Sequence, residues 1–186
     1  MKKNTLAMLM LTSLGLFTAN SFAAGYASGS LQVKVNVQSS CVVNTATVGG
    51  TTATDALLNF GSVKNLVSDV TANTSTSGQG LTVLCSPGTA WSLNFDGGSH
   101  LSGSQRRMQN SDGSQNYIAY NLYADSGYAT PIPVNTSTTD ATDSAYKNKT
   151  GTGAAQSVIV YGKIPATGQI PVPGDYADTV TVNVVF

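Results

Sequence analysis

Residues 31–38 alternate apolar and polar side chains without a break. A period of two, sustained over the whole segment, is typical of a β-strand that buries one face. Further strand candidates follow along the chain, at residues 41–43, 57–61, 81–85, 91–95, 106–108, 117–123, 157–162 and 176–184. Gly, Pro, Asn and Asp residues separate these candidates, and no segment shows sustained helical periodicity. The pattern predicts an all-β fold of about seven to nine short strands, arranged as a β-sandwich.

Three longer parts of the chain are predicted to be loops. Residues 48–55 are rich in Gly and Thr, and residues 71–80 are polar and rich in turn-forming residues. Residues 125–152 are predicted to be mostly loop, with one short strand candidate at 132–134.

The composition supports this prediction and counts against other classes of protein. Charged residues make up 10% of the chain, all nine acidic residues are Asp, and the formal net charge is +0. Glu, Lys, Leu and Arg, which fill the exposed faces of helices, are too scarce for a helical bundle. Nucleic-acid binding requires a basic surface that this chain lacks, so no nucleic-acid partner is expected. With 41% hydrophobic residues the chain can form a core, which counts against disorder.

Residues 1–23 are predicted to be a secretory signal peptide. Lys2 and Lys3 precede an apolar stretch at 6–17, and Ala23 ends a segment with small residues at the −3 and −1 positions of a cleavage site. The apolar stretch is too short to span a bilayer, although an uncleaved N-terminal anchor is the alternative. Cleavage after Ala23 leaves seven basic residues against nine Asp, a net charge of −2. We therefore expect an exported protein whose mature chain is slightly acidic.

Cys41 and Cys85 are the only two cysteines of the sequence. Export places them in an oxidising compartment, which favours a disulfide between them. Chain-entropy theory gives such a cross-link about 4 kcal/mol of stabilisation. The alternatives are a metal site or a reactive thiol, but a lone cysteine pair without a nearby histidine offers too few ligands for zinc.

Four short motifs occur along the mature chain: LNFG at 58–61, AYNLYAD at 119–125, VYGKIP at 160–165 and PGDYADTV at 173–180. Their order, together with the signal peptide, the alternating segment at 31–38 and the cysteine pair, resembles the spore coat protein U domain family. That family is found in subunits of archaic, Csu-type chaperone–usher pili. The resemblance covers essentially the whole mature chain.

The resemblance implies an incomplete immunoglobulin-like β-sandwich that lacks its last strand. Residues 24–40 would be an N-terminal donor-strand extension, and residues 41–186 would be the sandwich domain. The donor side chains that would enter the groove of a neighbouring pilus subunit are Leu31, Val33, Val35 and Val37. The residues that would edge the groove and pair with a periplasmic chaperone are Val180, Val182, Val184 and Phe186. At an outer-membrane usher, the donor strand of the next subunit would then replace the chaperone.

Elementary energetics agree with this implication. Burying four aliphatic side chains at about 1.5–3 kcal/mol each gives roughly 6–12 kcal/mol, and an open sheet edge offers backbone hydrogen bonds as well. A head-to-tail contact that does not close produces a filament. Alternation by itself indicates only that one face is buried, so residues 31–37 could also be the first strand of a complete sandwich.

We therefore expect a structural subunit of a pilus, exported through the periplasm to a cell-surface fimbrium that serves adhesion and biofilm formation. The alternative is a secreted monomeric coat or matrix protein of the same domain family. A secreted hydrolase is the alternative from the enzyme class, and the sequence shows no acid/base constellation for it.

Neither enzymatic activity nor a metal or cofactor is expected. A catalytic triad needs a base that a carboxylate orients beside a nucleophile. His100 is the only histidine and lies in a polar segment, so a surface position is expected for it. Arg106 and Arg107 are expected on a solvated strand face, and Trp91 is expected to fill the core.

Overall fold

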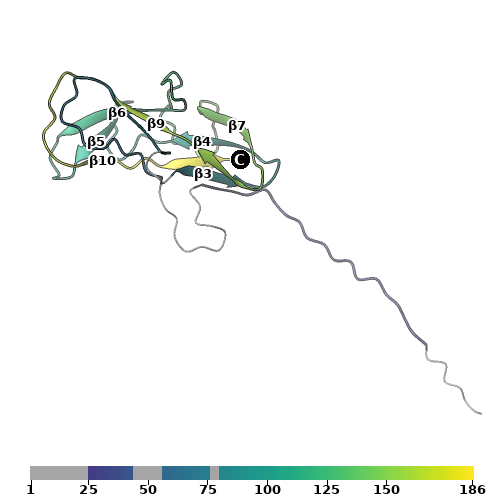
Figure 1. Ribbon diagram of the computed structural model, residues 1–186. Coiled ribbons are helices and arrows are strands. Elements are labelled where there is room, and N and C mark those ends of the chain that lie inside the picture. The colour runs from purple at the N-terminus through teal and green to yellow at the C-terminus, as the bar shows by residue number, and fades with distance from the viewer. Residues whose placement is uncertain (1–24, 44–55, 76–79) are drawn as a thin grey trace, which may run out of the picture. The chain divides into compact units, whose positions relative to one another are not determined.

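The computed structural model describes residues 25–43, 56–75 and 80–186. The predicted signal peptide, residues 1–23, and the predicted loop at 48–55 lie outside the described residues. The chain divides into two units, Met1–Asn36 and Val37–Phe186. All strands of the described residues belong to the second unit (Figure 1). No described segment forms a helix of the length and apolar character needed to cross a membrane.

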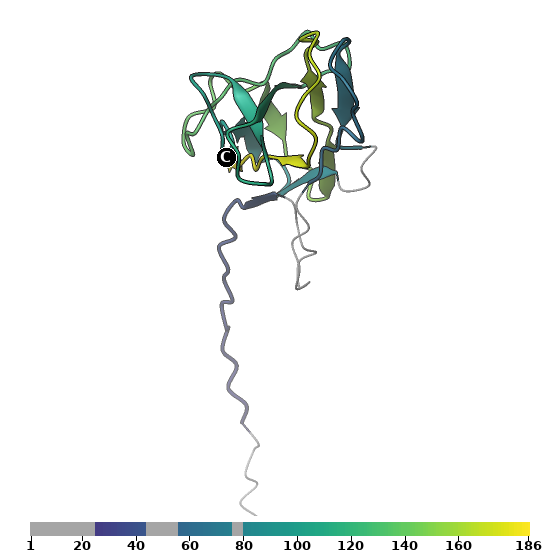
Figure 2. The same ribbon diagram turned by 90° about the vertical axis from the view of Figure 1, so that its left-hand side faces the viewer.

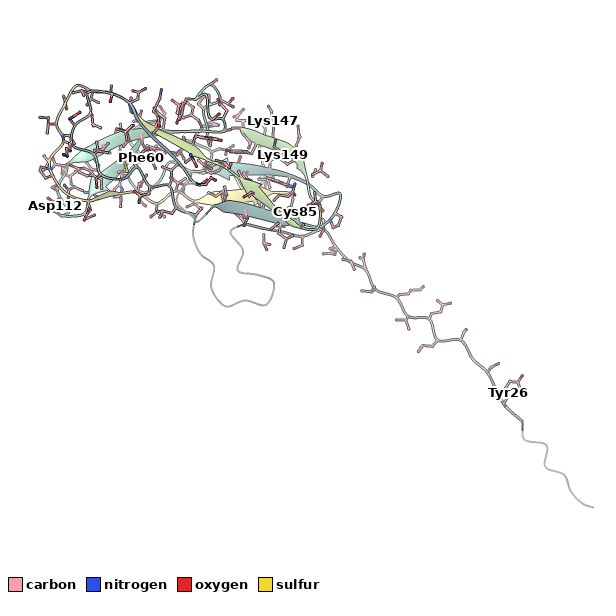
Figure 3. All side chains as sticks on the ribbon, in the orientation of Figure 1. Tyr26, Phe60, Cys85, Asp112, Lys147 and Lys149 are labelled. Atoms are coloured by element: carbon pink, nitrogen blue, oxygen red, sulfur yellow. A yellow bond between two sulfur atoms is a disulfide. The ribbon has the colours of Figure 1, made fainter. Side chains whose placement is uncertain are left out.

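Residues 25–40 contain neither strand nor helix, and Tyr26 near their start is exposed (Figure 3). The exposed fractions of the alternating apolar side chains are 88% for Leu31, 85% for Val33, 86% for Val35 and 82% for Val37. The strand predicted over 31–38 is therefore not formed in the single chain. A β-strand needs a neighbouring backbone for its hydrogen bonds, and no described strand pairs with this segment.

The second unit contains eleven strands among its described residues, and every strand pair is antiparallel. In chain order the strands are β1 (Cys41–Val43), β2 (Val70–Asn73), β3 (Leu81–Cys85), β4 (Ala90–Phe95), β5 (Arg106–Asn110), β6 (Tyr117–Tyr123), β7 (Tyr146–Thr150), β8 (Ala155–Val158), β9 (Tyr161–Ile164), β10 (Tyr176–Ala177) and β11 (Val182–Val185). No helix occurs in the described part of the chain.

These strands form three sheets, with the strand orders β1-β3-β8, β10-β5-β6-β9-β2 and β11-β4-β7. Figure 2 shows the same strands from a second side, with β11 in yellow at the C-terminal end of the chain. The inner faces of β3, β4, β6 and β9 supply most of the core. This arrangement confirms the predicted all-β fold, an immunoglobulin-like β-sandwich.

The core follows the alternation that the sequence shows. In β6, Ile118, Tyr120 and Leu122 are buried, while the residues between them are partly exposed. In β3 every second residue is likewise buried. Trp91 on β4 is buried, which confirms its predicted place in the core. Both β3 and β6, which lie inside their sheets, therefore bury one face at a period of two.

Several strands differ from the sequence-based prediction. β7 lies inside the predicted loop at 125–152, and β2 overlaps the start of the predicted turn-rich stretch at 71–80. Both are outermost strands of their sheets, and in β7 only Tyr146 is buried. Most side chains of β7 are exposed, so it has no apolar alternation from which to predict a strand. β2 has only four residues, which is too short a run for its alternation to stand out from the polar stretch that follows.

Other predicted strands are divided or not formed. Residues 57–61 and 132–134 form no strand, and residues 157–162 are divided between β8 and β9. The candidate at 176–184 is divided between β10, which pairs with β5, and β11, which pairs with β4. The chain crosses from one sheet to another between these last two strands.

Arg106 is buried, and its predicted place on a solvated strand face is wrong. Its guanidinium donates hydrogen bonds to four backbone carbonyls, those of Phe95, Asp96, Ile132 and Pro133, at 2.8–3.1 Å. Loss of water around the charge lowers the pKa of Arg106, and the four acceptors compensate for that loss. This side chain joins the end of β4 to the segment at 132–133.

Replacing Arg106 tests this role. We expect Arg106→Met to lower the free energy of unfolding by about 2–4 kcal/mol, because it leaves buried carbonyls without donors. Arg107→Met is the matched control: Arg107 donates to the carbonyl of His100 and lies over the ring of Tyr117 at 4.1 Å, but is only half-buried. We expect Arg107→Met to lower the free energy of unfolding by less than about 1 kcal/mol. Equal losses in urea unfolding of the two variants would contradict this role.

Candidate functional site

An apolar cavity of about 860 Å³ opens between the sheets of the second unit. Its wall comes from β3, β4, β5, β6, β9, β10 and β11, from the segment without strands at 56–64, and from the residues on either side of β10 between 170 and 180. Apolar side chains in the wall include Leu81, Phe95, Met108, Ile118, Leu122 and Ile164. Protein interiors are close-packed, with few voids larger than a water molecule. A cavity of this size is therefore a candidate binding site and not a packing defect.

Two of the sequence motifs meet at the cavity wall. Gly162 lies on β9, and a Cβ atom at this position would lie 2.8 Å from side-chain atoms of both Leu58 and Phe60. Gly61 then turns the segment with φ 71°, and its N–H donates to Oδ1 of Asn59 at 2.8 Å. The absence of a side chain at 162 lets Leu58 and Phe60 (Figure 3) pack on the sheet although they belong to no strand.

The cavity lies beside an edge of the sandwich. β11 pairs only with β4, and β1 pairs only with β3. These two outermost strands lie side by side (Figure 2), yet no ladder joins them among the described residues. An edge strand presents N–H and C=O groups with which a further strand can pair.

The four predicted groove-edge residues lie in different environments. Val180 and Val182 line the cavity, and Val184 packs half-buried against the core. Phe186 is 59% exposed and is not one of the cavity residues. The structure therefore brings two of the four to the cavity wall, while their role in pairing with a chaperone stays a prediction. The donor role of residues 31–37 also stays a prediction.

A disulfide fixes the edge strand β1. Cys41 and Cys85 lie opposite each other in the β1–β3 ladder and are bonded through their sulfur atoms. This confirms the predicted pairing. Because β3 is the central strand of its sheet and Cys85 is buried, the bond ties an edge strand of only three residues to the core.

The sequence pattern did not predict a role for Asp178, a polar residue in the cavity wall. The side chain of Asp178 is 2% exposed and accepts a hydrogen bond from the Tyr120 hydroxyl at 2.7 Å. Burial, together with this hydrogen bond, raises the pKa of Tyr120. His100, predicted at the surface, is half-buried with Nδ1 3.1 Å from Asp178. Tyr120 and Asp178 belong to two of the four motifs, which is the sequence signal that connects them.

The chemistry of the site is apolar burial with a few fixed hydrogen bonds. The described residues contain no group of three or more side chains suited to hold a metal ion. The cavity wall and the free edge of β11 together fit an extended peptide with apolar side chains on one face.

Comparisons with known proteins identify relatives of this chain. The Spore Coat Protein U domain family matches residues 27–183. No curated protein sequence matches the chain. Among solved structures, the chain is similar to one described as the CsuC–CsuE chaperone–tip adhesion subunit pre-assembly complex from archaic chaperone–usher Csu pili of Acinetobacter baumannii. The identity is 25% and the TM-score 0.48, and the alignment covers 81% of this chain but only 40% of that chain.

The close approach at Gly162 can be tested by adding one methyl group. We expect Gly162→Ala to lower the free energy of unfolding by about 1–3 kcal/mol, because Leu58 and Phe60 must move away from the new Cβ. Gly80→Ala is the control, since nothing lies within 4 Å of a Cβ at that position. If thermal unfolding shows no larger loss for Gly162→Ala than for Gly80→Ala, the packing described at this wall is wrong.

The disulfide can be tested by reduction and by substitution. Replacing Cys41 and Cys85 together by Ala should lower the free energy of unfolding by about 4 kcal/mol, because the unfolded chain gains freedom over a separation of 44 residues. Urea unfolding of the native protein with and without a reductant should give a similar difference. Unfolding at the same urea concentration under both conditions would argue against a stabilising bond.

Proposed function

This chain belongs to the Spore Coat Protein U domain family, and we propose that it is an exported structural subunit of a chaperone–usher pilus. In this proposal the subunits join by donor-strand exchange, in which residues 31–37 of one subunit fill the cavity of the next. One observation carries the proposal: the chain contains both an exposed segment with alternating apolar side chains and an apolar cavity beside an edge strand.

Removing the apolar face of residues 31–37 from water is energetically favourable. All four of its aliphatic side chains are exposed, and burial of each one contributes about 1.5–3 kcal/mol. The apolar residues of the cavity wall, which include Phe95, Ile118 and Leu122, offer contacts for such side chains. Gln32, Lys34 and Asn36 lie on the opposite face of an extended strand and would stay at the surface.

The donor segment and the strand edge with which it would pair have similar lengths. An extended strand rises about 3.3 Å per residue, so residues 31–37 span about 20 Å. Residues 180–185, which include β11 and two cavity residues, form a run of similar length. A donor strand beside β11 would add the backbone hydrogen bonds of a sheet edge to the burial of its side chains.

The partners follow from the same features. The donor segment and the cavity are different surfaces of the subunit, so each contact leaves a free end and the assembly grows as a filament. Before assembly, an exposed apolar edge promotes aggregation. We therefore infer that a periplasmic chaperone covers the edge and that an outer-membrane usher exchanges it for the next subunit.

The place of action follows from the predicted signal peptide and from the disulfide, which forms in oxidising compartments. The subunit would pass through the periplasm into a cell-surface fimbrium. Adhesion and biofilm formation are the roles that we propose for such a fibre.

Two neighbouring positions of the donor segment give a matched test. Val35→Asp places a carboxylate on the apolar face, whereas Asn36→Asp places the same group on the polar face of the same segment. We expect Val35→Asp to weaken assembly of the mature protein at least about 100-fold, because the buried charge has no partner. Asn36→Asp should assemble as the unchanged protein does. Size-exclusion chromatography and electron microscopy of exported protein measure both.

The same preparations distinguish the proposal from its alternative. Deletion of residues 24–38 should leave small particles that take up a synthetic peptide of residues 31–37. If instead the unchanged protein is a stable monomer and the deletion unfolds it, the segment belongs to its own sheet. A secreted monomeric coat or matrix protein of the same family would then be the better description.

A further inference from the structure

Asp178 lies where the chain crosses from one sheet to another. It follows β10, which pairs with β5, and precedes β11, which pairs with β4. The residue lines the cavity, yet its side chain is almost fully buried. The backbone N–H of Ser99 donates to Oδ1 at 2.8 Å, and the Tyr120 hydroxyl donates to Oδ2 at 2.7 Å. A buried carboxylate is tolerated only with such donors, so the position of Asp178 is closely determined.

Tyr120 connects this carboxylate, which directly follows β10, to β6 of the same five-stranded sheet. It lies on β6, within the five-stranded sheet, and its ring lines the cavity. The ring also packs against Phe60, with 6.5 Å between centroids in an edge-on arrangement. One hydrogen bond therefore links the five-stranded sheet to the segment that leads into β11. The raised pKa of the Tyr120 hydroxyl keeps it protonated, and so a donor, at neutral pH.

A second set of hydrogen bonds fixes the same crossing segment to the loop after β4. Asp96 and Thr181 bond twice: the N–H of Asp96 donates to the Thr181 carbonyl at 3.0 Å, and the N–H of Thr181 donates to Asp96 Oδ1 at 2.9 Å. Gly98 has φ 75°, and a Cβ there would lie 2.0 Å from Oδ2 of Asp178. The loop thus approaches the carboxylate more closely than any other residue type at 98 would allow.

We propose that Asp178 and Tyr120 are positioning residues for donor-strand uptake. Their hydrogen bond holds the segment that leads into β11 against the five-stranded sheet and keeps the cavity open until a donor strand arrives. This inference rests on the proposed function and extends it by naming the residues that control how fast the cavity accepts its partner.

The physical reason is the tendency of an apolar cavity to close. Its walls gain dispersion contacts by moving together, and β11 has a ladder on one side only to resist that movement. A hydroxyl–carboxylate hydrogen bond is strong and directional. A cavity that is held open binds without a prior rearrangement, whereas a cavity that is open for a fraction of the time binds in proportion to that fraction.

The protein contains a matched control for this bond. Tyr146 is also buried, and its hydroxyl donates to the Ile159 carbonyl at 2.6 Å. Tyr146 does not line the cavity. Tyr120→Phe and Tyr146→Phe each remove one buried hydroxyl and one hydrogen bond. Denaturant unfolding should show a loss for both, larger for Tyr120→Phe because its acceptor is charged. Only the first removes a bond between two residues of the cavity wall.

The experiment follows assembly of the full mature chain by light scattering, with electron microscopy of the products. We expect Tyr120→Phe to lengthen the half-time of assembly about ten-fold or more, because the lost bond has a charged acceptor. Tyr146→Phe should stay within about two-fold of the unchanged protein. Asp178→Asn should recover most of the rate that Asp178→Ala loses, since an amide keeps an acceptor for Ser99 and a donor for Tyr120.

The outcomes separate this inference from the proposed function. If the unchanged protein forms fibres and the two phenylalanine variants assemble at the same rate, the positioning role is overturned while the pilus proposal stands. If the unchanged protein forms no fibres under any condition, the proposed function fails, and the positioning role fails with it. If Tyr120→Phe assembles slowly and Tyr146→Phe assembles at the rate of the unchanged protein, the result supports both the positioning role and the proposed function.

Discussion

The free edge of β11 is the constraint on which the rest of the domain depends. A strand with a ladder on one side only leaves its other edge unpaired, and Val180 and Val182 beside this edge line the apolar cavity. The surrounding features hold this opening in shape. The disulfide anchors the neighbouring edge strand β1, and Gly162 lets Leu58 and Phe60 form a wall without a strand of their own.

Polar side chains stabilise the part of the domain that apolar packing leaves open. Arg106 donates to the Asp96 carbonyl, the Asp96 carboxylate accepts from Thr181, and the adjoining Asp178 carboxylate accepts from Tyr120. One continuous set of hydrogen bonds thus runs from the end of β4 to the start of β11. Each charged member is compensated by several partners, which is the condition for burying a charge without loss of stability.

The sequence predicts those features whose signal is local. Runs of strand-forming residues bounded by turn signals identified β3 and β6, and the compartment argument identified the bond between Cys41 and Cys85. The outer strand β7 carries no apolar alternation, and β2 has only four residues at the start of a polar, turn-rich stretch, so the sequence pattern predicted neither strand. Burial of Arg106 and Asp178 depends on acceptors and donors far away in the sequence, which no single segment reveals. The segment at 31–38 shows the strand pattern, yet forms no strand without a partner.

The place of the disulfide bears on how a fibre of such subunits would respond to pulling. Cys41 comes three residues after the end of the alternating segment, so tension arriving through that segment reaches the sulfur–sulfur bond almost at once. The force then passes covalently into β3, the middle strand of its sheet. The short ladder of β1 is shielded from it. Mechanical rupture would therefore begin at the non-covalent joint between subunits, and each domain would stay folded when the joint gives way.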